Sequence, residues 1–175
     1  MSKREIRALA SDDFAALMRL EEEVFGSAGE AVLGPYYVRL CCDFFRDTCF
    51  IALEDGKAVG YVLTFVRGRE AYCTTLAVAP ELQGSRVAFQ LLRRLIAAIC
   101  QRVDSCWFTV KEDNLAARAL HAAVGAREIS VREDFYGPGD RRIVARVDRA
   151  TFDKLQSRLG RLGLVEPSQD LAGVA

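Results

Sequence analysis

Apolar residues recur along the chain with two different spacings, which predicts strands interleaved with helices. Alternation, or a short apolar run between turn residues, predicts strands at residues 5–9, 48–53, 58–66, 71–78, 106–110, 126–135 and 142–147. Apolar stripes at helical spacing predict helices that begin after Ser11, at Pro35 and near residues 85, 114 and 151. The chain therefore belongs to the α/β class.

The predicted helix ends carry suitable residues. Ser11 or Asp12 can cap the first helix, Pro35 is a favoured first residue of the second, and Asp113 or Asn114 can cap the short alanine-rich one. The first helix is expected to expose Glu21, Glu22 and Glu23. The long helix over residues 85–103 should face the sheet with two rows, Ala88-Leu91-Leu95-Ala98 and Phe89-Leu92-Ile96-Ile99.

The order of elements predicts part of the sheet. Residues 48–53, 58–66 and 71–78 follow one another through short turns, one of them Asp55-Gly56, and should form an antiparallel meander. The long helix then leads to the nearly all-apolar strand 106–110. That strand should pair parallel to 71–78 through a right-handed crossover.

Composition limits the kind of protein. At 175 residues with 51% hydrophobic and 27% charged residues, we expect a single domain over residues 1–166. The helix 151–162 closes that domain, and residues 167–175 form a flexible tail. Zero net charge gives no reason to expect a nucleic-acid partner, and no apolar run is long enough for a membrane span. The first residues do not read as a signal peptide.

Cysteine usage points to a reducing compartment. The six cysteines form no Cys-x-x-Cys pair and accompany only one histidine, so no metal site is expected. Most lie in apolar runs and are interpreted as small core residues. We expect a cytoplasmic protein.

The segment from Thr75 to Leu95 carries the main chemical signal. An apolar strand ends at Val78, a short polar turn follows at Gln83, and a helical pattern begins at Val87. Such a junction directs free backbone N–H groups and the positive end of the helix dipole to one place, where a diphosphate fits well. The alternative is an ordinary strand-to-helix connection.

This segment resembles the cofactor-binding motif of the GNAT superfamily of N-acetyltransferases, a Gln/Arg-x-x-Gly-x-Gly/Ala turn after a strand. Gln83 matches its first position and Ala88 its last, whereas Arg86 stands where glycine is usual. The resemblance implies that acetyl-CoA binds at Leu76, Ala77, Val78, Gln83, Gly84, Ser85, Arg86, Val87 and Ala88. It also implies the GNAT fold: a mixed, mostly antiparallel sheet of about seven strands with helices on both faces, here followed by a C-terminal amphipathic helix.

A second motif strengthens the resemblance because it follows in the order of the family. Asn114 to His121 resembles Asn-x-x-Ala-x-x-Leu-Tyr, and Gly125-Ala126 resembles the following Gly-Phe pair. The resemblance implies that Asn114 contacts the cofactor arm as well as capping its helix. Arg118, one turn on, is expected either to meet a CoA phosphate or to face water.

The family mechanism needs neither a metal nor a covalent intermediate. The resemblance implies direct attack of an amine on the thioester, whose oxygen is held by backbone N–H groups. The usual tyrosine proton donor is replaced by His121, whose imidazolium could donate near neutrality, or which has no role. Tyr136 is the other candidate acid. No base is obvious; the candidates are Glu21, Glu22, Glu112 or a water relay.

The acceptor is less clearly indicated. Residues 37–49 resemble the corresponding part of diaminobutyrate acetyltransferases, which favours a small amine substrate. The GNAT resemblance also implies that the first two helices wall the acceptor site. The aromatic residues of the second helix either line that site or belong to a plain core helix. An alternative is a non-catalytic acyl-CoA sensor with the same fold. Another is acetylation of protein N-termini or lysines. The last amphipathic helix is a candidate surface for a homodimer.

Overall fold

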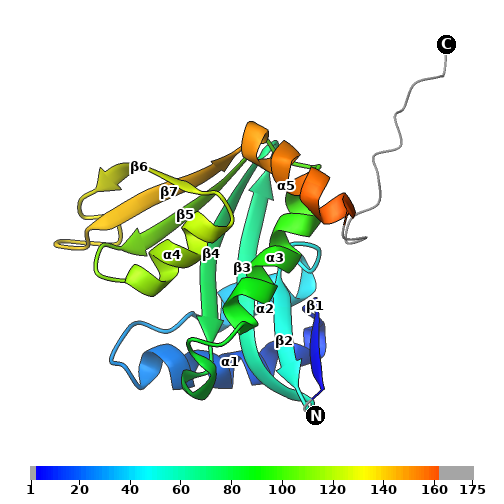
Figure 1. The fold of residues 1–175 in the computed structure, drawn as a ribbon. Coiled ribbons are helices and arrows are strands. Elements are labelled where there is room, and N and C mark those ends of the chain that lie inside the picture. The colour runs from blue at the N-terminus through cyan, green and yellow to red at the C-terminus, as the bar shows by residue number, and fades with distance from the viewer. Residues whose placement is uncertain (1–2, 162–175) are drawn as a thin grey trace.

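One seven-stranded sheet organises the computed structural model, which describes residues 3–161. The strand order across the sheet is β1-β2-β3-β4-β5-β7-β6 (Figure 1). The strands are β1 Arg4–Ala8, β2 Phe50–Glu54, β3 Lys57–Arg67, β4 Glu70–Val78, β5 Ser105–Lys111, β6 Arg127–Arg132 and β7 Arg142–Asp148. β6 is shorter than the predicted strand 126–135.

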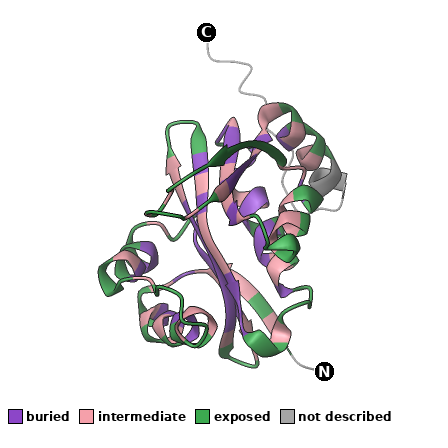
Figure 2. Ribbon diagram, turned by 90° about the vertical axis from the view of Figure 1, so that its left-hand side faces the viewer, coloured by how far each residue is buried: buried purple, intermediate pink, exposed green. Residues whose placement is uncertain are grey.

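Helices cover both faces of the sheet, as Figures 1 and 2 show from two directions. They are α1 Phe14–Glu21, α2 Pro35–Asp43, α3 Val87–Ile99, α4 Leu115–Ala123 and α5 Arg149–Arg161. Short turns of other helical types lie at Ser11–Asp13, Glu22–Gly26 and Pro80–Leu82. The predicted tail at 167–175 lies outside the described residues.

The predicted connections of the sheet are confirmed. β2, β3 and β4 form an antiparallel meander, and β4 pairs with β5 in parallel after the α3 crossover. The β2–β3 turn uses Asp55 and Gly56 with φ of 50° and 83°, which suits the Asp-Gly pair of a tight hairpin. All six cysteines are free and buried.

Helix α3 packs on the sheet in a slightly different rotation from the prediction. It begins at Val87, which is fully buried, while Phe89 is 41% exposed. Phe89, the first residue of the second predicted row, therefore faces solvent and not the sheet. Leu91, Leu92 and Leu95 form the buried centre of the helix.

The N-terminal region corrects two expectations. Neither Ser11 nor Asp12 caps the first helix; Asp13 instead accepts hydrogen bonds from the backbone N–H of Ala10 at 2.7 Å and from Arg7. The Arg7 guanidinium lowers the pKa of the Asp13 carboxyl. Glu21 is buried and not on the solvated face, because its carboxylate holds the Leu33 backbone N–H at 2.8 Å and the Tyr61 hydroxyl.

The C-terminal helix α5 begins at Arg149 and not at 151. Gly125, with φ of 81°, ends α4 as predicted, and a Cβ there would lie 2.5 Å from the Thr151 methyl. The end of α4 thus packs closely against α5. Over residues 3–161 no helix is long and apolar enough to cross a membrane.

Candidate active site

Strands β4 and β5 separate part-way along their length. Their parallel pairing ends at Cys73 and Phe108, yet β4 continues to Val78 and β5 to Lys111. Thr74 is the extra residue of a bulge against β3, because Leu63 pairs with Thr75 and Thr64 with Cys73. Alternate N–H and C=O groups of β4 beyond Cys73 therefore point into an opening instead of a ladder.

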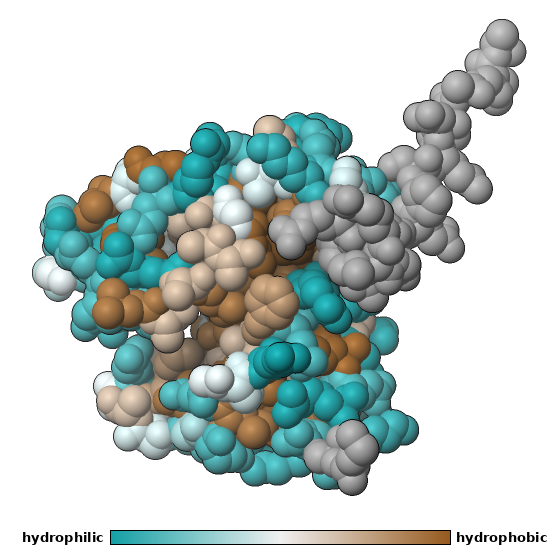
Figure 3. Space-filling view, viewed as in Figure 1, coloured by the Kyte–Doolittle hydropathy of each residue, from teal (hydrophilic) through white to brown (hydrophobic). Residues whose placement is uncertain are grey.

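The segment after β4 lines the same opening with backbone donors. In the turn, Gly84 has a φ of 80°, which favours glycine. The described residues provide no acceptor for the backbone N–H groups of Gly84, Arg86 and Ala88, whereas that of Val87 donates to Ser85 Oγ at 3.3 Å. These free donors at the start of α3 fit the phosphate groups of a nucleotide cofactor. Figure 3 shows the surface hollowed between this turn and α4, with an apolar floor.

Gly60 of β3 holds the start of α3 close to the sheet. A Cβ at this glycine would lie 3.0 Å from the Ala77 carbonyl oxygen and 3.1 Å from both Val87 and Leu91. The absence of a side chain at Gly60 therefore lets the first turns of α3 pack directly over β3 and the end of β4. This packing sets where the free N–H groups point.

Two hydroxyls meet beside the bulge. The Tyr37 hydroxyl of α2 lies 2.5 Å from Thr74 Oγ1, and Thr74 donates to the Leu63 carbonyl at 3.2 Å. Since Thr74 has only one hydroxyl proton, Tyr37 is the donor between the pair. Burial raises the pKa of Tyr37, which stays protonated.

A second hydroxyl chain runs across the opening from β5 to the β6–β7 hairpin. Tyr72 of β4 lies 2.9 Å from Thr109 Oγ1 and 3.1 Å from the Tyr136 hydroxyl. Burial raises the pKa of Tyr72, so it also stays protonated. Tyr136 is 62% exposed, and the Arg142 guanidinium lies 5.0 Å from its ring centre.

Aromatic residues of α2 and of the turn that follows it divide between two sides. Tyr37 and Phe45 pack edge-on against Phe65 of β3, at 5.5 and 4.6 Å between ring centres. Tyr36 and Phe44 are 92% and 78% exposed and face away. Only part of the aromatic set therefore forms a wall beside the hydroxyls.

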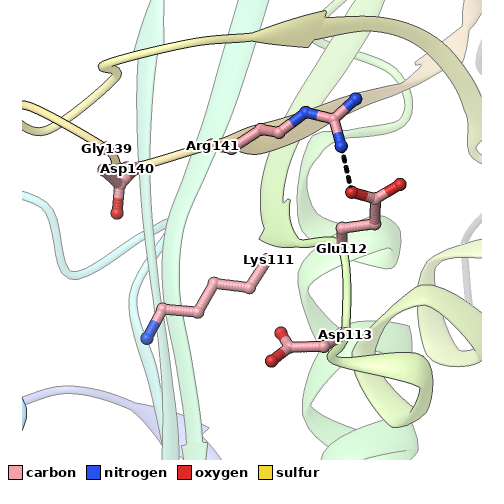
Figure 4. A pocket seen from close by; sticks show the side chains of 6 residues that line it. All are labelled: Lys111, Glu112, Asp113, Gly139, Asp140 and Arg141. Carbon is pink, nitrogen blue, oxygen red and sulfur yellow. Dashed lines mark hydrogen bonds and ion pairs between the residues drawn. The ribbon is translucent and has the colours of Figure 1, made fainter.

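A charged pocket of about 390 Å³ lies at the end of β5 (Figure 4). It is lined by Lys111, Glu112, Asp113, Gly139, Asp140 and Arg141. Its cations already have partners: Lys111 lies 3.4 Å from Glu30, and Arg141 binds both Glu112 and Glu133. The pocket thus offers both signs of charge next to the hairpin that carries Tyr136. Among the described residues, no group of side chains is suited to hold a metal ion.

A sequence profile of the acetyltransferase (GNAT) family matches residues 14–126, more than half of the chain. The chain belongs to the GNAT acetyltransferase family. Its fold is the GNAT fold that the two sequence motifs predict, including the mixed seven-stranded sheet.

Curated relatives of this GNAT protein act on different kinds of acceptor. It is 30% identical over 118 residues to the L-2,4-diaminobutyric acid acetyltransferase of Halalkalibacterium halodurans, covering 61% of each chain. It is 32% identical over 94 residues to the [ribosomal protein bS18]-alanine N-acetyltransferase of Escherichia coli, covering 53% of this chain and 64% of the relative. The chain thus spans less than two thirds of the length of either relative.

A solved structure confirms the fold. The diaminobutyrate acetyltransferase EctA from Paenibacillus lautus, solved with L-2,4-diaminobutyric acid and coenzyme A, superposes with a TM-score of 0.70 at 22% identity. The match covers 83% of this chain and 95% of that one.

Within the GNAT fold, the residues of the second motif on α4 have different contacts. Asn114 caps the helix, since its Oδ1 accepts the Ala117 N–H at 3.0 Å. Arg118 does not simply face water: it donates to Glu128 at 2.7 Å and to the Glu112 carbonyl at 2.9 Å. Any role in holding CoA would require this ion pair to open.

His121 is packed against the sheet and only partly exposed to solvent. Its ring lies 4.5 Å from the Phe108 ring, and its buried Nδ1 has no hydrogen-bond partner in the described part of the chain. Burial lowers the pKa of His121 to about 4. The imidazole is therefore neutral near pH 7, unlike the imidazolium expected from its ordinary pKa.

The candidate bases are mostly engaged elsewhere. Glu21 is buried and ties the segment after α1 to β3 through Leu33 and Tyr61, and burial raises its pKa. Glu112 pairs with Arg141, and Glu22 is exposed with no ion pair among the described residues. None of the three contacts the hydroxyl chain, so a water relay fits the described geometry better.

Sequence reasoning did not identify Tyr37 and Tyr72 as site residues. Tyr72 and Thr74 stand two apart in a strand that is mostly apolar, so their side chains are expected to share one face. That polar pair was the available signal. Nothing in the local sequence indicated that Tyr37 would contact Thr74, because the two residues lie 37 positions apart in the chain.

Proposed function

We propose that this protein is an N-acetyltransferase that moves the acetyl group of acetyl-CoA to a primary amine of a small molecule. The observation that carries the proposal is the opening where β4 and β5 part, next to the free N–H groups of Gly84, Arg86 and Ala88. A diphosphate at the turn and a thioester between the strands would use both sets of donors.

In the proposed reaction the neutral amine nitrogen attacks the thioester carbon directly. A C–N bond forms, the C–S bond breaks, and the thiolate takes up a proton. β4 backbone beyond Cys73 is assigned to the developing oxyanion. Tyr136, linked to Tyr72, is assigned to donate the proton to the thiolate, because its hydroxyl is accessible at the rim of the opening. The ammonium proton leaves through water.

The charged pocket supports an acceptor that carries both an ammonium and a carboxylate group. A carboxylate would reach Lys111 or Arg141 by replacing their present partners, Glu30 for Lys111 and Glu112 or Glu133 for Arg141. Asp113 is the anion assigned to the ammonium, because Asp140 is already held by Arg142. A diamino acid has this combination plus a second amine that can react. The six buried free thiols support a reducing compartment such as the cytoplasm.

A panel of acceptors tests the proposal. Purified protein is mixed with acetyl-CoA and diamino acids, diamines without a carboxylate, or peptides with an N-terminal alanine. Release of the CoA thiol and the mass of the product are measured. We expect diamino acids to be acetylated best, and no turnover on any small amine contradicts the proposal.

A second candidate, protein N-terminal acetylation, is favoured by the similarity to the bS18-alanine N-acetyltransferase. Turnover on peptides alone would select it. Tight acetyl-CoA binding without turnover on any acceptor would select the third, a non-catalytic acyl-CoA sensor.

A further inference from the structure

Strand β6 forms an open edge of the sheet. It pairs only with β7, and every residue of Arg127–Arg132 is exposed. Ile129 and Val131 are each 46% exposed, and apolar surface is visible along this side in Figure 3. An edge of this kind presents unpaired backbone N–H and C=O groups to any complementary strand.

The sequence of this edge is complementary to itself about Ser130. In an antiparallel pair of two copies centred there, Arg127 lies opposite Glu133, Glu128 opposite Arg132, and Ile129 opposite Val131. Each pair joins opposite charges or two β-branched side chains, both of which stabilise cross-strand pairing. Each pair also occurs twice by symmetry.

Neighbouring registers lose this complementarity. A shift by one residue in one direction places Arg127 opposite Arg132, and a shift in the other places Glu128 opposite Glu133. Like charges directly opposite one another destabilise a strand pair. The charge pattern therefore favours the register centred on Ser130 over the two registers next to it.

We propose that β6 pairs antiparallel with β6 of a second copy of this chain, about a twofold axis at Ser130. The contact is isologous, and it joins two sheets into one. Arg132 has no ion pair among residues 3–161, so the Glu128 carboxylate of the other copy gives it one. Glu128 already binds Arg118 and would then lie between two cations.

The same contact reaches toward the charged pocket. Glu133 follows β6 directly and holds Arg141, a pocket residue, at 2.9 Å. In the paired form Glu133 also faces Arg127 of the second copy. Dimer formation therefore adds a contact at the base of the hairpin that carries Tyr136.

A bulge at Ile129 interrupts the pairing of β6 with β7. Bulges and charges are also means by which edge strands avoid pairing. That alternative predicts a monomer at every concentration, so the mass of the protein in solution distinguishes the two.

The test uses sedimentation of the full chain over a concentration series. We expect the wild-type mass to rise toward twice that of the monomer. Arg132→Glu alone and Glu128→Arg alone each create two like-charge pairs and should raise the dimer dissociation constant about tenfold or more. Mixed together, the two variants regain opposite charges at both positions and should form a heterodimer.

Arg93→Glu is the matched control, since Arg93 is exposed on α3, away from β6, and undergoes the same charge reversal. It should dimerise as the wild type does. Glu128→Arg also loses the ion pair with Arg118, so circular dichroism is used to show that this variant still folds. A monomeric wild type, an undiminished Arg132→Glu dimer, or a mixture of folded variants that stays monomeric overturns the proposal.

Discussion

The hydroxyls of Tyr72 and Tyr136 lie 3.1 Å apart and join strand β4 to the β6–β7 hairpin. Tyr72 is also held by Thr109 of β5, so the chain of hydroxyls spans the place where β4 and β5 part. One end of this chain is packed within the sheet, and the other, Tyr136, is exposed. This arrangement is the reason why we propose Tyr136 as the proton donor.

Tyr136→Phe removes that hydroxyl while keeping the ring. We expect kcat to fall about tenfold to a hundredfold with the acceptor found in the panel, because proton transfer in the transition state is lost. The Kd for acetyl-CoA should stay within error. Tyr36→Phe is the control, since Tyr36 is 92% exposed on α2. An unchanged kcat for Tyr136→Phe would place the donor elsewhere.

His121 should make stability depend on pH. Its pKa is lowered by burial to about 4 in the folded chain, below the ordinary value of 6.5. The unfolded chain therefore binds the proton more readily, and stability is lost as pH falls from about 6.5 toward 4. We expect the free energy of unfolding to fall by about 1–3 kcal/mol over this range. Partial exposure of the ring to solvent reduces the effect.

Urea unfolding of wild type and His121→Phe between pH 4 and 8 measures this effect. Phenylalanine keeps the stacking on Phe108 but cannot be protonated. In the variant, the free energy of unfolding should depend less on pH, because the contribution of His121 is absent. The same variant tests catalysis. If the activity of the wild type falls as pH rises through 6.5 and that of His121→Phe does not, the protonated imidazole of His121 is the proton donor after all.

Arg86 stands at the start of α3 with helical dihedrals, φ of −79° and ψ of −1°. With this backbone the side chain can point outward to a phosphate without crowding the turn. We expect Arg86→Gly to weaken acetyl-CoA binding about threefold to tenfold, more at low salt, where charge contacts are less screened.

Calorimetry at two salt concentrations measures this affinity, with Arg19→Gly of α1 as a control for loss of an exposed arginine. Glycine at this position also destabilises the start of α3, so the affinity of Arg86→Gln for acetyl-CoA is measured as well. Tighter binding by Arg86→Gly would mean that the arginine blocks the turn. That outcome would favour a non-catalytic protein.

Gly60→Ala should move the start of α3. The added methyl would lie 3.0 Å from the Ala77 carbonyl, a backbone atom that cannot turn aside. We expect a loss of about 1–3 kcal/mol in the free energy of unfolding, together with weaker acetyl-CoA binding. Gly34→Ala is the matched control, because nothing lies within 4 Å of a Cβ there. Equal effects of the two changes would show that the close approach is unimportant.

Local patterns were enough to predict most elements of the fold. The meander, the α3 crossover and the cap at Asn114 depend on residues close together in the chain, and the structure confirms them. The turn at Gly84 also follows from local sequence, since proline and glycine mark where the strand ends and the helix begins.

Residues whose environment comes from distant segments could not be predicted in the same way. Glu21 lies in an acidic run that resembles a solvated face, yet Tyr61, 40 positions away, buries and binds it. Arg118 is taken by Glu128 of the next strand, not by solvent. Each outcome depends on which segment packs alongside.

The sequence by itself determined the order of strands and helices, the family and the turn that can hold a diphosphate, because these rest on short-range spacing. Only the tertiary structure decided the protonation of His121 and the pairing of Tyr72 with Tyr136. A pKa depends on how far packing removes water from a group, and a hydroxyl contact depends on strands meeting that are distant in the chain. Neither quantity is encoded in the local pattern of hydrophobic and polar residues.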